Sequence, residues 1–253
     1  MQNKQLFISD LHLCAERPAS TALFLKFLEQ DARQCAALYI LGDLFEAWLG
    51  DDDTHPESLR VMAALRRLTD HGVPVYIMHG NRDFLIGSGF ETMTGCCLLP
   101  DPCVIHLYDQ PTLLMHGDTL CTQDTEYQTI RLQVRDPAWQ QALLALPLAQ
   151  RVELARRYRL ESQEKMRNKS EAIMDVDQAA VENIMREHCV RRLIHGHTHR
   201  PAVHDFYIDG EQTQRIVLGD WYEQGSALWC SREGCELNHL PFPPRNDGGV
   251  ECL

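Results

Sequence analysis

The chain has 253 residues, of which 44% are hydrophobic and 24% are charged, and this balance excludes a wholly disordered protein. Its formal net charge of -12 disfavours general binding to DNA or RNA, whose phosphates repel an acidic surface. The most apolar segment, residues 142–149, is interrupted by Pro147, whereas a membrane-spanning helix needs about 20 apolar residues. We therefore expect a cytoplasmic protein that is at most peripheral to a membrane.

Short apolar runs alternate with helical patterns along the first half of the chain. We predict strands at 6–8, 38–41, 75–78 and 112–115, with helices at 22–32 and 58–71. The last third adds strands at 193–194 and 216–218 and a hairpin over 227–240. This order predicts an α/β fold with helices on the faces of the sheet.

Residues 124–187 interrupt the alternation, because their pattern is helical throughout and predicts no strand. The segment separates two core strands, so we interpret it as a helical insertion, or lid, within a single domain that spans residues 1–240. The tail at 241–253 contains three prolines and Asp247-Gly248-Gly249, which predict disorder.

Ten cysteines raise the question of disulfides or zinc. None forms a C-x-x-C pair, and Cys96 and Cys97 are adjacent. We expect reduced thiols in a reducing compartment.

Polar clusters follow five of the predicted strands. They are Asp10 to His12, Gly42-Asp43, His79 to Asp83, His116 to Asp118 and His195 to His199. Ligands of open α/β sheets bind beyond the carboxyl ends of strands, so these clusters are expected to converge. Their His, Asp and Asn side chains, without cysteine, suit Mn, Fe, Zn or Co. One such cluster alone is more often a helix cap or a packed histidine, but five together favour a metal site.

Several polar residues stay open on this evidence. His79, His199, Asp83 and Asp118 could orient metal ligands from behind, or could simply be polar loop residues. Histidines outside the clusters are interpreted as structural; they are His55, His71, His106, His188 and His239.

The ordered clusters resemble the calcineurin-like metallophosphoesterase superfamily, whose signature is D-x-H, G-D, G-N-H-[DE], H and G-H-x-H. The matching residues are Asp10-x-His12, Gly42-Asp43, Gly80-Asn81-Arg82-Asp83, His116 and His195-x-His197 around Gly196. The resemblance covers the chain to about Leu218 and implies mixed β-sheets flanked by helices and two divalent ions, with Mn²⁺ expected. It implies that Asp10, His12, Asp43 and His197 hold one ion and that Asp43, Asn81, His116 and His195 hold the other, with Asp43 bridging.

The third motif departs from the common pattern, because Arg82 stands where many members carry histidine. Arginine stays protonated and cannot act as a general acid near neutral pH. It can pair with phosphate oxygens through two hydrogen bonds. We therefore expect a leaving group that needs no proton, as in pyrophosphate cleavage.

The extended motifs also resemble the UDP-2,3-diacylglucosamine hydrolase family of lipid A biosynthesis. They are residues 8–13, 42–48, 80–85, 116–121 and 195–201. The resemblance implies attack of metal-activated water on the α-phosphorus, giving UMP and 2,3-diacylglucosamine 1-phosphate (lipid X). It also implies manganese dependence and a peripheral location on the cytoplasmic face of the inner membrane. We expect a monomer. A broader nucleotide-sugar pyrophosphatase, a cyclic-nucleotide phosphodiesterase and a metal-free scaffold are the alternatives.

The same resemblance implies site residues. The catalytic set is Asp43, Asn81, Arg82 and His195, and the substrate contacts are Asn81, Arg82, Asp124, Ser162, Met166, Lys169 and His195. Relatives often carry a small polar residue where this chain has Met166, so a contact there would use the backbone.

The predicted insertion is locally basic in an acidic protein. Its cations are Arg151, Arg156, Arg157, Arg159, Lys165, Arg167 and Lys169, and apolar residues precede them at Trp139, Leu143, Leu144, Leu146 and Leu148. Such a segment can bind acyl chains and lie against anionic lipid. The alternative is an ordinary amphipathic helix pair with a solvated basic face.

Overall fold

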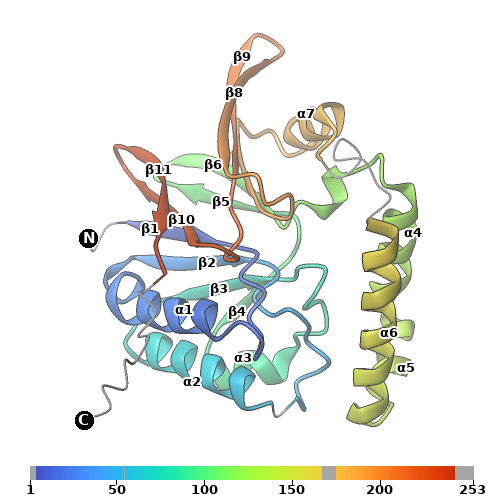
Figure 1. The fold of residues 1–253 in the computed structure, drawn as a ribbon. Coiled ribbons are helices and arrows are strands. Elements are labelled where there is room, and N and C mark those ends of the chain that lie inside the picture. Colours follow the sequence, from blue (N-terminus) through green and yellow to red (C-terminus); the bar gives the residue numbers. More distant parts are fainter. Residues whose placement is uncertain (1–3, 54, 167–174, 243–253) are drawn as a thin grey trace, which may run out of the picture.

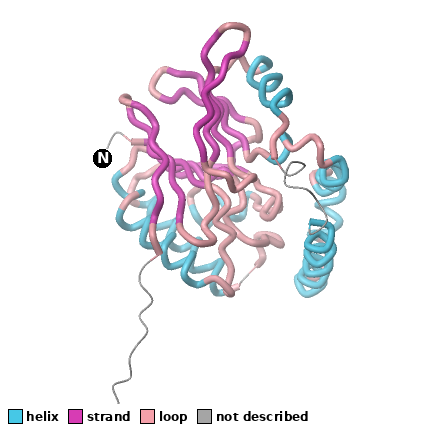
Figure 2. Tube along the Cα trace, turned by 45° about the horizontal axis from the view of Figure 1, so that its top comes forward, coloured by secondary structure: helices cyan, strands magenta, loops and turns pink. Residues whose placement is uncertain are grey.

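The computed structural model describes residues 4–53, 55–166 and 175–242, with the backbone alone for 161–166. Two mixed sheets form its centre (Figures 1 and 2). The first has the order β11-β10-β1-β2-β3-β4 and the second β5-β6-β7-β9-β8. The strands are β1 (Gln5–Ile8), β2 (Ala37–Leu41), β3 (Val75–Met78), β4 (Cys97–Leu99), β5 (Cys103–Leu107), β6 (Gln110–Met115), β7 (Arg192–His195), β8 (Ala202–Ile208), β9 (Glu211–Val217), β10 (Gly225–Ser231) and β11 (Gly234–Leu240).

The central strands run parallel, which brings the ends of β1, β2 and β3 to one edge and those of β6 and β7 to another. All five residues of β2 are buried, because helices cover one face of its sheet and the second sheet covers the other. Phe7, Leu41 and Ile194 belong to the cluster packed between the sheets.

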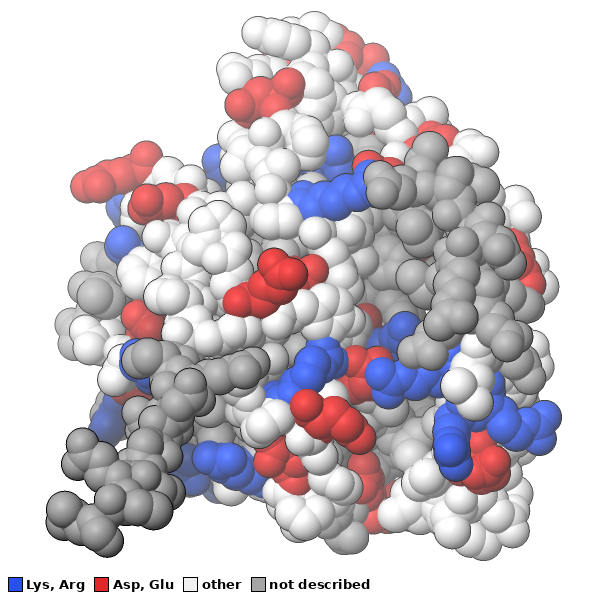
Figure 3. All heavy atoms as spheres, viewed as in Figure 1, with Lys and Arg blue, Asp and Glu red and all other residues white. Residues whose placement is uncertain are grey.

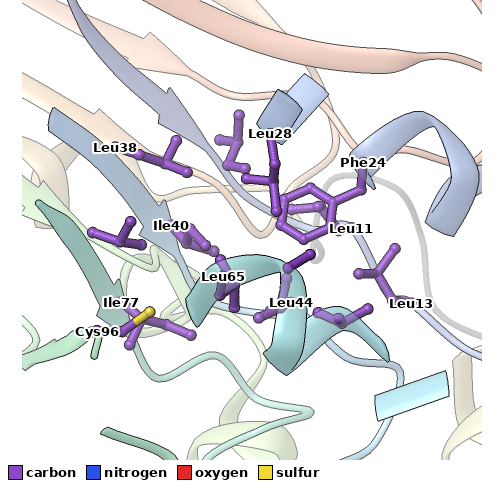
Figure 4. Close-up of a cluster of buried hydrophobic side chains, with 14 of the residues drawn as sticks. Leu11, Leu13, Phe24, Leu28, Leu38, Ile40, Leu44, Leu65, Ile77 and Cys96 are labelled. Carbon is purple, nitrogen blue, oxygen red and sulfur yellow. The ribbon is translucent and has the colours of Figure 1, made fainter. Parts of the chain in front are cut away.

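Helices α1 (Pro18–Gln30), α2 (Pro56–Asp70) and α3 (Ser88–Thr94) cover the outer face of the first sheet (Figure 1). Phe24 and Leu65 from these helices belong to one buried cluster with Leu38 and Ile40 of β2, which Figure 4 shows. Helix α7 (Gln178–Glu187) covers the second sheet through Val181 and Met185. The core is therefore a four-layer α-β-β-α sandwich, with short 3₁₀ turns at η1 (Ala32–Gln34) and η2 (Asp118–Leu120).

Three further helices lie beside the sandwich (Figure 1). They are α4 (Thr125–Val134), α5 (Pro137–Leu144) and α6 (Leu148–Met166), which with α7 make up the described helices of the predicted insertion. Asp124 and Asp136 cap α4 and α5 by accepting hydrogen bonds from backbone N–H groups. The insertion's action as a lid stays a prediction.

Several details differ from the sequence predictions. Helix α1 begins at Pro18 and ends at Gln30, earlier than the predicted 22–32. Strands β4, β5 and β8 and helix α3 were not predicted; β5 and β8 are sheet edges whose exposed polar residues interrupt the apolar pattern. Most of the predicted disordered tail, residues 243–253, lies outside the described residues. No helix among the described residues has the length and apolar character that crossing a bilayer requires.

The expectation of reduced thiols is wrong at one pair. Cys230 on β10 and Cys235 on β11 form a disulfide. These residues are direct partners in the antiparallel register of the hairpin, which brings their side chains together. Cys14, Cys35, Cys96, Cys97, Cys103 and Cys189 form no disulfide.

Candidate metal centre

The loops at the strand ends carry an unusual backbone. Asp10, His12, Asp43, His197 and His199 all have left-handed φ values, between 49° and 68°. They are five of the nine non-glycine residues with positive φ in the described part of the chain. This conformation costs on the order of 1–3 kcal/mol per residue and gathers at functional sites. The strained residues are ones that the sequence analysis placed in or beside the metal site.

Backbone contacts lock these loops together. Asp10 N donates to Gly42 O at 3.1 Å, and His12 N donates to Asp43 O at 2.9 Å. A Cβ on Gly80 would lie 2.1 Å from Asp43 Oδ1, so only glycine permits this approach. The motif glycines therefore bring the loops into contact.

Asp10, His12 and His199 form the first group of ligand-type side chains. Each offers one atom within 4.8 Å of the others. His199 Nε2 lies 3.3 Å from Asp10 Oδ1 and 3.3 Å from His12 Nε2, which itself lies 3.7 Å from Asp43 Oδ2. These imidazole nitrogen and carboxylate oxygen atoms therefore lie within reach of a single ion.

Asp10, Asp43 and His116 form the second group under the same distance limit. Asn81 Oδ1 lies 3.0 Å from His116 Nε2 and 3.0 Å from His197 Nδ1, so Asn81 and His197 join this group. His116 Nδ1 donates to Leu41 O at 2.9 Å, which leaves Nε2 turned toward the carboxylates. Asp10 belongs to both groups, and Asp43 of the second lies beside His12 of the first, so the two groups adjoin.

The electrostatics of the cluster call for a cation. Burial, with Asp83 and Asp10 nearby, raises the pKa of Asp43 to about 7 despite His116 and Arg82. Burial would lower the pKa of His116, but Asp43, Asp10 and Asp118 outweigh it and raise that pKa to about 9. Buried carboxylates thus draw a proton into the site, and a divalent ion would supply the same compensation.

Buried polar atoms without hydrogen-bond partners indicate whether metal ions fit this site. Among the described residues, Asp10 Oδ1, which faces His199 Nε2 in the cluster, is buried without a hydrogen-bond partner. Buried polar atoms normally have partners, so such orphans need an explanation. An arrangement of carboxylate, imidazole and amide oxygen atoms, without cysteine, fits divalent ions such as Mn²⁺.

His195 does not join the ligands. It is fully buried at the end of β7, with Nδ1 donating to Gly196 O at 2.8 Å and Nε2 lying 3.3 Å from Arg215 Nη1. Burial, together with the charge of Arg215, lowers its pKa to about 3. The predicted set of ligands and substrate contacts is therefore corrected: His199 lies in the cluster and His195 lies behind it. The pattern Gly196-His197-Thr198-His199 matches G-H-x-H directly, and this was the missed sequence signal.

Arg82 and Asp83 occupy different places. Arg82 N donates to Asp43 Oδ1 at 2.8 Å, so Arg82 lies directly beside the cluster. Its Nε atom is buried without a hydrogen-bond partner among the described residues. Asp83 is fully buried and accepts from the backbone N–H groups of Gly80 at 2.8 Å and Leu44 at 2.7 Å. Asp83 therefore joins two motif loops.

Asp118 connects the cluster to α4. It accepts hydrogen bonds from Tyr127 Oη at 2.6 Å and Arg131 Nε at 2.7 Å. The ring of Tyr127 stacks on His197, with centroids 5.9 Å apart. Although burial opposes ionisation, the pKa of Asp118 lies below its usual range because of His116, His197 and Arg131.

The predicted substrate contacts are only partly described. The side chain of Asp124 caps α4 by accepting from Tyr127 N at 3.1 Å. Ser162 and Met166 lie on the backbone-only part of α6, and Lys169 lies outside the described residues. Outside the cluster, His79 Nε2 lies 2.7 Å from Ile86 O and holds its own loop.

A group of side chains that surrounds His12, here called the shell, was not predicted from the sequence. Tyr222 stacks on His12 at 5.3 Å, and the Arg17 guanidinium lies 4.4 Å from the Tyr222 centroid. Arg17 also pairs with Glu46, whose Oε2 lies 3.9 Å from His12 Nδ1. Arg159 of α6 reaches Glu46 Oε1 at 3.1 Å. None of these residues belongs to a metal motif, so only the fold reveals the shell.

Comparison with known proteins adds three findings. A model of the calcineurin-like phosphoesterase family matches residues 4–201. A UDP-2,3-diacylglucosamine hydrolase of Escherichia coli O7:K1 is 52% identical over 237 residues, covering 94% of this chain and 99% of that protein. One of Chromohalobacter salexigens is 56% identical over 216 residues, covering 85% and 88%. The family match spans every loop of the cluster.

Proposed function

Because the chain belongs to the calcineurin-like phosphoesterase family, we propose that it hydrolyses the pyrophosphate bond of UDP-2,3-diacylglucosamine. The products would be UMP and 2,3-diacylglucosamine 1-phosphate, with water adding to the α-phosphorus and the bridging oxygen leaving with the β-phosphate. The observation that carries this proposal is the buried Asp–His cluster with an arginine, Arg82, in place of a protonating histidine.

The proposed ligand set follows the distances described above. One ion would be held by Asp10, His12, Asp43 and His199, and the other by Asp43, Asn81, His116 and His197. Divalent ions held there would neutralise phosphate charge and lower the pKa of the attacking water. The oxygen and imidazole donors support Mn²⁺.

Arg82 would stabilise the charge that develops on the pyrophosphate. A guanidinium offers five donors in a planar fork and remains charged at all working pH values. The unpaired Nε of Arg82 leaves a donor available beside the cluster. A departing phosphate monoester needs no proton, because its second pKa is about 6. This chemistry supports a diphosphate substrate over an alkyl phosphate.

The insertion would bind the acyl chains. Helices α4 to α6 expose large apolar side chains: Ile130, Leu132, Leu144, Val152, Tyr158 and Leu160. Exposed apolar surface of this extent marks binding surfaces. Lys and Arg side chains gather over α6 in Figure 3, where Arg156, Arg157 and Arg159 are exposed. We propose that this basic, apolar face also contacts anionic lipid at the inner membrane.

One assay tests the proposal. Purified protein with Mn²⁺ is given UDP-2,3-diacylglucosamine in detergent, and UDP-N-acetylglucosamine in parallel, while UMP release is followed. We expect metal-dependent UMP release from the lipid substrate alone. Equal turnover of both substrates would favour the broader nucleotide-sugar pyrophosphatase. No metal-dependent turnover of either would reject the hydrolase.

A further inference from the structure

His195 and Arg215 form a buried pair behind the ligand loop. Strands β7 and β9 pair in parallel, with Leu193 opposite Arg215 and His195 opposite Val217. His195 and Arg215 are therefore diagonal neighbours on one face of the second sheet. Their side chains meet there, with Arg215 Nη1 3.3 Å from His195 Nε2.

This contact fixes the tautomer of His195. Arginine can only donate hydrogen bonds, so Nε2 must accept and the proton must lie on Nδ1. At 2.8 Å from Nδ1 lies Gly196 O, a carbonyl that can only accept. Both neighbours of the ring therefore require the same tautomer.

The Gly196 carbonyl belongs to the peptide that leads into His197. Gly196 O also accepts from Thr198 N at 2.9 Å, and Gly196 N donates to His116 O at 2.9 Å. His197 N donates to Asp10 Oδ2 at 2.9 Å. A chain of hydrogen bonds thus runs from Arg215 through His195 and this peptide to Asp10, which lies in both ligand groups.

Stability alone is a weak reason for Arg215, although the charge of nearby Asp175 favours its ionised form. Its side chain is 8% exposed, and Nε has no hydrogen-bond partner among the described residues. Burying an unpaired donor costs free energy, and an apolar residue would avoid that cost. The guanidinium is therefore a costly way to fill this position unless its hydrogen bond to His195 matters.

We propose that Arg215 is a positioning residue of the metal centre. By holding His195 as the Nδ1–H tautomer, it orients the Gly196–His197 peptide and sets His197 against Asn81 and Asp10. The reversed tautomer would turn a lone pair of Nδ1 toward the Gly196 carbonyl and repel it. This inference rests on the proposed metal centre.

The first test measures the tautomer in metal-free protein. Long-range ¹H–¹⁵N correlation spectra report which imidazole nitrogen carries the proton, and His195→Asn identifies the signal. We expect Nδ1–H for His195 in the wild type and in Arg215→Lys, which keeps a cationic donor. In Arg215→Met only the Gly196 carbonyl still favours Nδ1–H, so we expect an Nε2–H population to appear that the wild type lacks. An Nε2–H tautomer in the wild type would overturn the proposal.

The second test measures Mn²⁺ dissociation constants from the electron paramagnetic resonance signal of free Mn²⁺. Partners behind metal ligands typically contribute about 10–100-fold in affinity, and we expect a loss of that size in Arg215→Met with a near wild-type value in Arg215→Lys. Wild-type affinity in Arg215→Met would also overturn the proposal.

Two substitutions of His195 test the proposal independently, in case Arg215→Met does not fold. His195→Asn can place its amide nitrogen where Nδ1–H stood, so we expect it to bind Mn²⁺ about as the wild type does. His195→Gln places its amide near Nε2 and is expected to weaken binding about 10–100-fold. Equal weakening in both would contradict the proposal. If the wild type binds no Mn²⁺, the proposed function fails; a wrong tautomer with intact Mn²⁺ binding overturns only the role of Arg215.

Discussion

The metal centre and helices α4 to α6 hold their side chains in opposite ways. In the centre, Asp10, His116 and Asp43 are at most 1% exposed and sit on loops joined by short backbone hydrogen bonds. Helices α4 and α5 have no buried residue at all. Catalysis requires side chains that are held in one geometry. Binding flexible acyl chains, the proposed role of the insertion, requires accessible apolar surface.

Arginines connect the two regions. Arg131 pairs with Asp118, Arg135 donates to Gly80 O at 2.8 Å, Arg151 pairs with Asp52, and Arg159 pairs with Glu46. The partners lie on the loops that follow β6, β3 and β2, which also carry the proposed ligands. We therefore expect changes in the insertion to alter substrate binding while leaving metal binding intact, and changes in the centre to do the reverse.

Asp43→Asn is expected to have the largest effect. Asp43 would touch both ions, so its loss should lower kcat by on the order of 10³-fold or more and abolish full metal loading. Steady-state kinetics with metal analysis of chelator-free protein measures this. Near-normal turnover at normal metal content would exclude the bridging role.

The same variant separates function from stability. The folded protein raises the pKa of Asp43 from its ordinary value of 3.8 to about 7, chiefly through burial, so ionised Asp43 destabilises the metal-free fold as pH rises from about 4 to 7. Asparagine removes that charge. At pH 8 in chelator, we expect Asp43→Asn to melt at the wild-type temperature or higher. A clearly lower melting temperature would show that Asp43 is chiefly structural.

Arg82→Gln should come next. Removing a donor that stabilises developing charge costs about 10²–10³-fold in kcat. Metal content should stay at the wild-type level, because Arg82 lies outside the proposed ligand set and its proposed role is to donate to the substrate. Parallel loss of metal would place Arg82 in the support of the cluster. Arg82→Lys, which keeps the charge and loses the fork, is expected to fall between the two.

Much of the centre follows from the sequence because its motifs are local. Asp10 and His12, or Gly80 and Asn81, lie close in the chain, and strand ends place them at one edge without knowledge of packing. The error at His195 arose within such a motif: three alternating histidines fit a two-histidine pattern in two ways. Side-chain direction decides between them, because His195 still belongs to β7 and lies behind the cluster.

Other features depend on contacts between distant segments. Tyr222 covers His12 across 210 positions of the chain, and Arg159 reaches Glu46 from the insertion. No local pattern marks these pairs. The Cys230–Cys235 disulfide depends on hairpin register, which brings two residues opposite each other only once the turn is placed.

Arg151→Ala tests the insertion's attachment. Arg151 is 2% exposed, pairs with Asp52 and donates to Leu146 O at 3.0 Å. Losing these contacts should loosen α6 and raise KM for the lipid substrate about tenfold, the equivalent of one or two hydrogen bonds. Mn²⁺ affinity should not change. Arg60→Ala, which removes an exposed arginine of α2 outside the insertion, is the matched control, and equal effects in both would argue against a specific attachment.

The last prediction concerns membrane binding rather than catalysis. The net charge of -12 repels anionic lipid, so attraction must come from local charge such as exposed Arg156 and Arg157 on α6. Each basic residue near an anionic surface contributes about 1 kcal/mol, or roughly fivefold in partitioning. Reversing both to glutamate should weaken sedimentation with phosphatidylglycerol vesicles by at least 20-fold, roughly, at low salt and less at high salt. The matched control reverses exposed Arg60 and Arg67 on α2, which changes the net charge equally. Equal losses in the two variants would mean that the net charge governs membrane binding and that α6 does not form a specific lipid-binding surface.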